Sequence, residues 1–142
     1  MKVRVKKLHP NAVIPKYAKD GDAGLDLVAV DRVHNFSKGC YDYGTGLSIE
    51  IPNGYVGLIF PRSSIRNYNQ LLTNHVGVID SGYRGEIRFS FKDIEPDITD
   101  RYEIGNKIAQ LMIIPYPKIE LEEVEELSST ERGSGGFGSS GK

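Results

Sequence analysis

The stretch from Asn74 to Phe91, NHVGVIDSGYRGEIRFSF, constrains the fold of this chain more than any other. Its first half is rich in valine and isoleucine, its second half alternates apolar with polar residues, and Ser81-Gly82 between them has the composition of a turn. This pattern predicts a β-hairpin. Asp80 and Tyr83 flank the bend, so a carboxylate and an aromatic ring would project near a rigid tip. Asp80 there either makes a local Asx-turn or takes part in recognition and chemistry.

Length and composition fit one domain. A chain of 142 residues can bury roughly 68–70% of its unfolded surface, so a core forms without disulfides. The 18 basic and 19 acidic residues leave the chain nearly neutral, which gives no electrostatic support for direct nucleic-acid or membrane-surface binding. Cys40 has no partner for an internal disulfide, and the N-terminal MKVRVKKLHP lacks an apolar signal region. We therefore expect an intracellular, cytoplasmic protein without a membrane span.

Short alternating segments separated by turn residues predict an all-β domain over residues 1–127. Besides the two hairpin arms, strands are expected at residues 2–6, 25–29, 39–51, 55–60 and 107–114. Gly44 and Gly46 mark a bulge or bend, and Pro52-Asn53-Gly54 marks a turn. The acidic segment 118–127, KIELEEVEEL, is interpreted as a solvated edge strand or a subunit contact.

Two strands carry polar residues that need an explanation. Asp26 lies on the strand face opposite Leu25 and Leu27, where a carboxylate is either solvated or a ligand. Gln110 interrupts the apolar run 107–114, so its amide must bond to the backbone or to a ligand.

The sequence changes character at Pro61-Arg62-Ser63-Ser64. Pro61 should end a strand, and Ser63 or Ser64 would be a good N-cap for a short helix over residues 64–71. Free N–H groups at that helix start, two hydroxyls and the Arg62 guanidinium would together form a phosphate site. The alternative is simple helix capping, with Arg62 a surface charge.

Residues 128–142 are expected to form a flexible C-terminal arm. Its last part, RGSGGFGSSGK, holds five Gly and three Ser and cannot bury enough surface to fold alone. It is either a linker or an arm that closes over a nucleotide, because Arg132 could grip a phosphate and Phe137 could stack on a base.

The five segments DAGLDLVA, PRSS, GVIDSGYRG, KIAQL and RGSGGFGSSG occur in this order and resemble the five motifs of the trimeric dUTPase family. The resemblance implies a jelly-roll-like β-barrel or sandwich with one short helix. It also implies a homotrimer with shared active sites and Mg²⁺-dependent hydrolysis of dUTP to dUMP and pyrophosphate. Such an activity limits uracil incorporation into DNA and supplies dUMP for dTMP synthesis. The chain has Ser64, Asn106 and Ser140 where the family usually has Gly, Asp and Thr.

The resemblance assigns chemistry and base recognition to the predicted hairpin. Asp80 would be the general base that activates water for in-line attack on the α-phosphorus. Tyr83 would pack under the deoxyribose and exclude a 2′-OH. Asn74 and the backbone around Val78 and Ile79 would read uracil in a cavity too narrow for the thymine methyl group.

The same resemblance assigns phosphate binding to Arg62, Ser63, Ser64 and Gln110. Arg132 would clamp the γ-phosphate and Phe137 would stack on uracil once the arm closes. The resemblance also implies that Mg²⁺ is held mainly by phosphate oxygens and waters, with Asp26 as an outer-sphere carboxylate.

Two other functions are considered. In the related dCTP deaminase group a Glu acts in deamination at the position of Ser90, and a Ser cannot shuttle protons in the same way. A non-catalytic nucleotide-sensing or protein-binding module would be expected to have lost Asp80 or the arm, and both are present.

Overall fold

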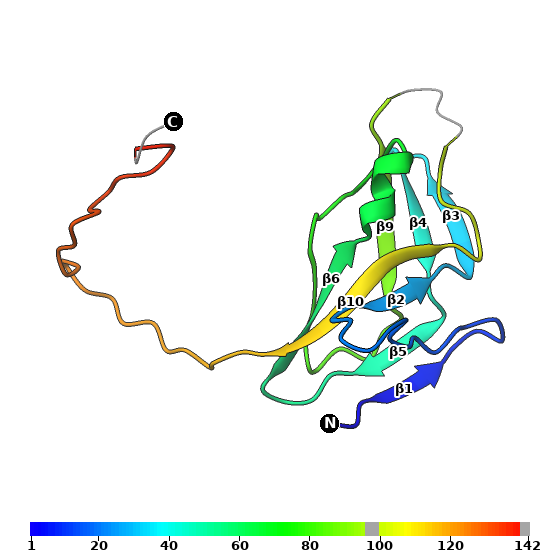
Figure 1. Ribbon diagram of the computed structural model, residues 1–142, viewed down its shortest axis with the longest axis horizontal. Coiled ribbons are helices and arrows are strands. Elements are labelled where there is room, and N and C mark those ends of the chain that lie inside the picture. Colours follow the sequence, from blue (N-terminus) through cyan, green and yellow to red (C-terminus); the bar gives the residue numbers. More distant parts are fainter. Residues whose placement is uncertain (96–99, 140–142) are drawn as a thin grey trace.

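The computed structural model describes residues 1–95 and 100–139. Figure 1 shows a body of packed strands and a C-terminal arm that extends away from it. The described residues form ten strands and one short 3₁₀ helix, so the prediction of a jelly-roll-like all-β fold is confirmed, with open sheets rather than a closed barrel. No helix in the described part of the chain is both long and apolar enough to cross a membrane.

All strand pairs are antiparallel and fall into three sheets. The two-stranded sheet joins β1 (Arg4–Lys7) to β5 (Leu47–Glu50). The second sheet has the order β2 (Leu25–Val28), β10 (Lys107–Pro115), β6 (Tyr55–Pro61), β8 (Gly77–Ile79). The third has the order β3 (Asp31–Asn35), β4 (Cys40–Gly44), β9 (Arg88–Asp93), β7 (Gln70–Leu72).

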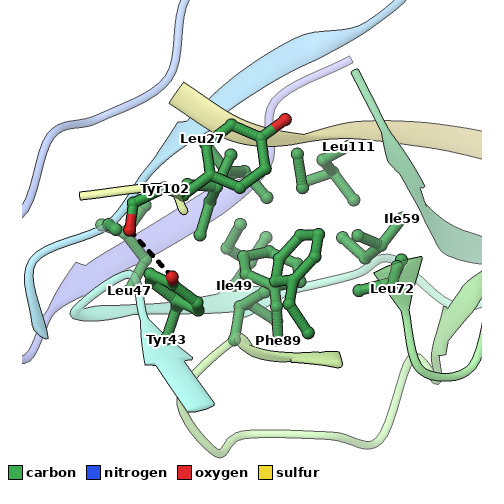
Figure 2. Packing of buried hydrophobic residues seen from close by; sticks show 14 of the residues in the cluster. Leu27, Tyr43, Leu47, Ile49, Ile59, Leu72, Phe89, Tyr102 and Leu111 are labelled. Carbon is green, nitrogen blue, oxygen red and sulfur yellow. Dashed lines mark hydrogen bonds between the residues drawn. The ribbon is translucent and has the colours of Figure 1, made fainter. Parts of the chain in front are cut away.

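The inner faces of the sheets meet in one apolar core (Figure 2). Because side chains alternate along a strand, each strand contributes every second residue to this core. The labelled core residues are Leu27, Tyr43, Leu47, Ile49, Ile59, Leu72, Phe89, Tyr102 and Leu111. Burying each of the leucine, isoleucine and phenylalanine side chains contributes about 1.5–3 kcal/mol. The Tyr43 hydroxyl donates to the Tyr102 carbonyl at 2.8 Å, which satisfies a buried polar group.

The predicted hairpin between residues 74 and 91 is wrong. Its first arm, β8, pairs with β6, whereas its second arm, β9, pairs with β4 and β7 in another sheet. Residues 80–87 therefore cross from one sheet to the other. The alternating pattern correctly predicted a strand. The strands that pair with β9 are set by burial of Phe89 and Phe91 in the shared core, and not by the turn residues.

The predicted strand over residues 39–51 is two strands, because the chain turns at Gly44–Gly46 and passes from β4 to β5. Gly46 has φ +63°, and a Cβ there would lie 2.6 Å from Cβ of His9. The expected bend is thus confirmed. The turn at residues 52–54 is also confirmed: the Tyr55 N–H donates to the Pro52 carbonyl at 3.1 Å.

The predicted helix over residues 64–71 is wrong in type, length and cap. A 3₁₀ helix, η1, covers Ser63–Asn67; its N-cap is Arg62, and no side chain caps it. Gln70 instead opens β7 and is buried, with its amide group bonded to Asp93 at 3.1 Å and to the Tyr102 N–H at 3.1 Å. A buried amide with two partners held in this way outweighs local helix preference. The strand β6 ends at Pro61, which pairs with Ala109, so it runs one residue beyond the expected end at Phe60.

The chain leaves the sheets after Pro115, and residues 116–139 contain no strand. The acidic segment 118–127 is exposed along its whole length, so within one chain it is not an edge strand. Ser140, part of the arm's last motif, lies outside the described residues.

Candidate functional site

A cationic cluster is centred on Asp26 of β2. Oδ1 of Asp26 accepts from Nε of Arg62 at 2.8 Å and from Nε2 of Gln110 at 3.3 Å, and its Oδ2 lies 3.0 Å from Nζ of Lys107. The amide of Gln110 is thus satisfied by a side chain. Burial raises the pKa of Asp26, but the bonds from Lys107, Arg62 and Gln110 together hold that pKa below its usual range. The cluster therefore combines two cations with one anion, a balance that suits an anionic ligand.

Sequence reasoning missed Lys107. Residues 107 and 110 should lie on opposite faces of a regular strand, because side chains alternate. The β2–β10 register shifts between Lys107 and Ala109, and this irregularity brings Lys107 to the same carboxylate as Gln110. A β-bulge cannot be placed from the apolar pattern of this segment.

Two positions that depart from the family motifs have defined bonds. The Ser64 hydroxyl accepts from Nη1 of Arg62 at 3.3 Å, so it helps to orient the guanidinium. Oδ1 of Asn106 accepts from the Glu103 N–H at 2.9 Å, a role that an Asp oxygen would fill equally well. Ser63 is exposed at the start of η1, beside this cluster.

A second cluster surrounds the free edge of β8. A cavity of about 210 Å³ opens where β8 and β9 diverge, lined by Asn74, Val78, Ile79 and Ser90 among others. β8 is the last strand of its sheet, so one edge of its backbone has no strand partner among the described residues. Such an edge presents N–H and C=O groups that can read the polar edge of a planar base.

Asp80 and Tyr83 stand at the end of β8, beside a second hollow of about 210 Å³. Asp80 is exposed, and its carbonyl accepts from the Tyr83 N–H at 3.0 Å, which closes the turn. The Tyr83 hydroxyl donates to the Glu86 carbonyl at 3.0 Å. A Cβ on Gly85 would lie 2.4 Å from that hydroxyl, so glycine is required for the ring to fold back. The ring remains 43% exposed, enough to present a face to a ligand.

The hollow beside Asp80 also contains Glu86 and Arg88, which the sequence did not single out. Arg88 bonds Glu86 at 2.7 Å and Asp31 at 2.7 Å. Asp31 belongs to β3, a polar strand that was not predicted, so no local pattern could have found this pair. Ser90 donates its hydroxyl to Asp42 and provides no carboxylate for proton transfer.

The arm residues Arg132 and Phe137 are not brought to either cluster. Figure 1 shows the arm extending away from the sheets. Nε of Arg132 donates to the Gly135 carbonyl at 3.1 Å, and the Phe137 side chain is fully exposed.

The two clusters are far apart within the chain. Asp80 directly follows Ile79, which pairs with Gly57 of β6. Asp26 pairs with Gln110 of β10, and Gln110 pairs with Phe60 of β6. Asp26 therefore lies two strands from β6, on the side away from β8. With about 3.3 Å per residue and about 4.8 Å per strand spacing, the Cα atoms of Asp80 and Asp26 are about 19 Å apart. One chain therefore presents the two clusters at opposite edges of one sheet.

No group of three or more His, Cys, Asp or Glu side chains among the described residues could hold a metal ion by itself. Asp26 is the carboxylate nearest to the predicted phosphate ligands, and its two oxygens already accept from three side chains. A cation at this cluster would have to be held mainly by its ligand's own oxygens and by water, which fits the way proteins bind Mg²⁺ with triphosphates.

Comparison with known proteins gives a consistent result. The family model described as dUTPase matches residues 10–141. The deoxyuridine 5′-triphosphate nucleotidohydrolase of Crocosphaera subtropica is 41% identical over 150 residues, covering 99% of both chains. That of Helicobacter pylori is 40% identical over 144 residues, covering 99% of this chain and 97% of the relative. The solved structure of Staphylococcus bacteriophage 80alpha dUTPase with dUPNHPP superposes with a TM-score of 0.84 at 31% identity, covering 99% of both chains.

Proposed function

The chain belongs to the dUTPase family, and on this premise we propose that it hydrolyses dUTP to dUMP and pyrophosphate in the cytoplasm, limiting uracil incorporation into DNA and supplying dUMP for dTMP synthesis. The observation that carries the proposal is that Asp80 and Tyr83 follow β8, whose outer edge has no strand partner among the described residues, next to the cavity between β8 and β9. That cavity is large enough for a base. The Asp80 carboxylate, the Tyr83 ring that would contact the sugar and the β8 backbone that would bind the base then lie next to one another.

Asp80 acts as the general base. Its carboxylate takes a proton from water while the water oxygen forms a bond to the α-phosphorus, and the bond from the α-phosphorus to the bridging oxygen breaks to release pyrophosphate. Asp80 is exposed, which leaves its oxygens accessible to water and substrate. General base catalysis of this kind contributes about 10²–10⁴-fold.

Arg62, Ser63, Ser64 and Gln110 bind the phosphates. Arg62 and Gln110 are already oriented by Asp26, so they are held in place before the anion arrives. Mg²⁺ bound with the triphosphate would neutralise phosphate charge, and Asp26 would hold it through water. Lys107 adds a second positive charge at the same carboxylate.

The active enzyme is a homotrimer with sites shared between subunits. A general base must lie within hydrogen-bond reach of the water it activates. The Cα atoms of Asp80 and Asp26 are about 19 Å apart by strand geometry, so we take the two clusters as half-sites that serve one nucleotide when they come from different chains. The Asp80 and Tyr83 half-site at the end of β8 of one subunit then faces the cationic cluster around Asp26 of a second subunit, and the arm that carries Arg132 and Phe137 closes over them.

The acidic segment 118–127 and the strand β1 support this assembly by their composition. Ile119 and Leu121 are exposed and alternate with glutamates, whereas β1 and the residues before it, MKVRVKK, alternate valine with cations. Among the residues that the structure describes, β1 pairs only with β5, so its other edge has no strand partner there. Apolar residues including Val3, Val5 and Ile113 line a groove of about 300 Å³ beside it. The acidic segment of one subunit is thus suited to add to β1 of another.

The structure offers no specific support for deamination, because Ser90 is bonded to Asp42 and holds no carboxylate in the cavity between β8 and β9. The test is pyrophosphate release from dUTP, UTP, dTTP and dCTP, with ammonia release from dCTP measured in parallel. The proposal expects pyrophosphate from dUTP alone at appreciable rate. Ammonia from dCTP would favour the deaminase, and tight dUTP binding without any product would favour a sensing module.

A further inference from the structure

Arg84 lies in the crossing segment between Tyr83 and Gly85, and its guanidinium turns back onto the turn that carries Asp80. Nη1 of Arg84 donates to the Ser81 carbonyl at 2.7 Å and to the Tyr83 carbonyl at 2.9 Å. These two carbonyls come from the residue after Asp80 and from Tyr83 itself. One cation therefore bonds the backbone of Tyr83 and the backbone of the residue that follows Asp80.

Arg84 is itself anchored to the neighbouring sheet. Its Nη2 lies 3.5 Å from Oε1 of Glu50, and its backbone carbonyl accepts from the Ser48 hydroxyl at 2.7 Å. Ser48 and Glu50 both belong to β5, which is held between β1 and the core. The exposed turn is thus tied to a rigid strand through one residue.

We propose that Arg84 is a positioning residue that sets the orientation of Asp80 and Tyr83, and so contributes to turnover and to the exclusion of ribonucleotides. The proposal rests on the proposed dUTP hydrolysis. Arg84 is 53% exposed in its side chain and does not fill the core, so its bonds act on the turn rather than on packing. Without the guanidinium, the turn would keep the Asp80 carbonyl to Tyr83 N–H bond, the Tyr83 hydroxyl to Glu86 carbonyl bond and the Ser48 bond to the backbone carbonyl of residue 84. It would lose both bonds to the Ser81 and Tyr83 carbonyls, and catalytic geometry is lost with displacements of about 1 Å.

The experiment compares wild type, Arg84→Ala, Arg84→Lys and the control Lys38→Ala. Lys38 is a cation in another exposed turn, between β3 and β4, and it touches neither half-site. Melting temperature and mass in solution establish that each variant is a folded oligomer. Steady-state kinetics with dUTP and UTP give kcat and KM, and hydrogen exchange reports on the amides of residues 80–85.

For Arg84→Ala we expect amide exchange at residues 81–83 to become at least about tenfold faster. We expect kcat for dUTP to fall about 10–100-fold with a smaller change in KM, and the preference for dUTP over UTP to narrow several-fold. Lysine donates to one carbonyl and so should restore part of each loss, whereas Lys38→Ala should match wild type. If Arg84→Ala does not fold, Arg84→Lys carries the same readouts at reduced size.

Folded Arg84 variants with unchanged exchange at residues 81–83, or with unchanged kcat and unchanged preference for dUTP, would overturn the role of Arg84. Wild-type protein that releases no pyrophosphate would overturn the proposed function instead. In that case the exchange measurement still decides whether Arg84 holds the turn.

Discussion

Asp80, the residue after β8, and Asp26 of β2 lie at opposite edges of the same four-stranded sheet, with β6 and β10 between them. Their Cα atoms are about 19 Å apart by strand geometry. In the proposed shared site, the carboxylate that activates water and the carboxylate that orders the phosphate ligands of one nucleotide come from different subunits. Assembly is then part of the proposed chemistry.

Replacing Asp80 by Asn should preserve nucleotide binding and lower kcat for dUTP by roughly 10²–10⁴-fold, because the amide keeps the shape but cannot accept the proton. Rapid-quench kinetics and calorimetric titration with a non-hydrolysable dUTP analogue measure the two properties separately. Near-normal turnover would remove Asp80 from the mechanism.

Replacing Tyr83 by Ala should raise kcat/KM for UTP relative to dUTP, because the ring that would collide with a 2′-OH is gone. Tyr83→Phe is the matched control: it keeps the ring and loses only the hydroxyl bond to the Glu86 carbonyl, so it should retain most of the discrimination. Wild type should use UTP and dTTP poorly. Comparable kcat/KM values for UTP and dUTP in wild type would refute the role of Tyr83.

Deleting residues 132–142 should spare the fold and the trimer but lower kcat/KM for dUTP severely, because the arm excludes water and completes the phosphate clamp. Ordering the arm costs about 1–2 kcal/mol per residue, and stacking of Phe137 returns only about 1–3 kcal/mol. We therefore expect hydrogen exchange to slow in the arm with Mg²⁺ and a non-hydrolysable dUTP analogue but not with dUMP. A truncated protein as active as the full chain would make the arm a linker.

Asp31 and Arg88 provide a test of pH dependence. The bond from Arg88 holds the pKa of Asp31 below its usual range against the opposing effect of burial. A carboxyl group with a lowered pKa in the folded state stabilises the fold at pH values above its pKa in the unfolded state, which is about 3.9. This stabilisation is lost as the pH falls from that value through the lower, folded-state pKa. Asp31→Asn should therefore cost up to about 1 kcal/mol at pH 7, since the pair is partly exposed, and less near pH 3. Denaturation at a fixed protein concentration measures the free energy of unfolding of each variant. An equal loss of this free energy at pH 7 and near pH 3 would contradict the ion-pair explanation.

Local patterns predicted most strands, because alternation and turn glycines report directly on which face of a segment is buried. They failed where the partner of a segment is chosen by the core. The sequence of residues 74–91 is typical of a hairpin, yet β8 and β9 join different sheets. The cavity between β8 and β9 exists because the two strands do not pair. Gln70 in an apparent helix and Asp31 in a polar strand are similar cases, because their partners lie far away in sequence.

The candidate site divides in the same way. Asp26, Arg62 and Gln110 were each identified from the sequence, and the structure brings them together around one carboxylate. Lys107 was missed because a register shift rather than a pattern places it there. Arg84 was missed because its partners are backbone carbonyls, which leave no trace in side-chain spacing.

The most direct test mixes two variants that each lack one part of the proposed site. Asp80→Asn subunits retain the cationic cluster around Asp26, and Arg62→Ala subunits retain the general base. A mixed trimer therefore contains intact sites only if each site takes Asp80 and Arg62 from different chains. After the two proteins are unfolded together in equal amounts and refolded, random assembly into rings should restore about a quarter of the wild-type rate of pyrophosphate release from dUTP. Activity no greater than the sum of the two separately refolded variants would contradict the shared site.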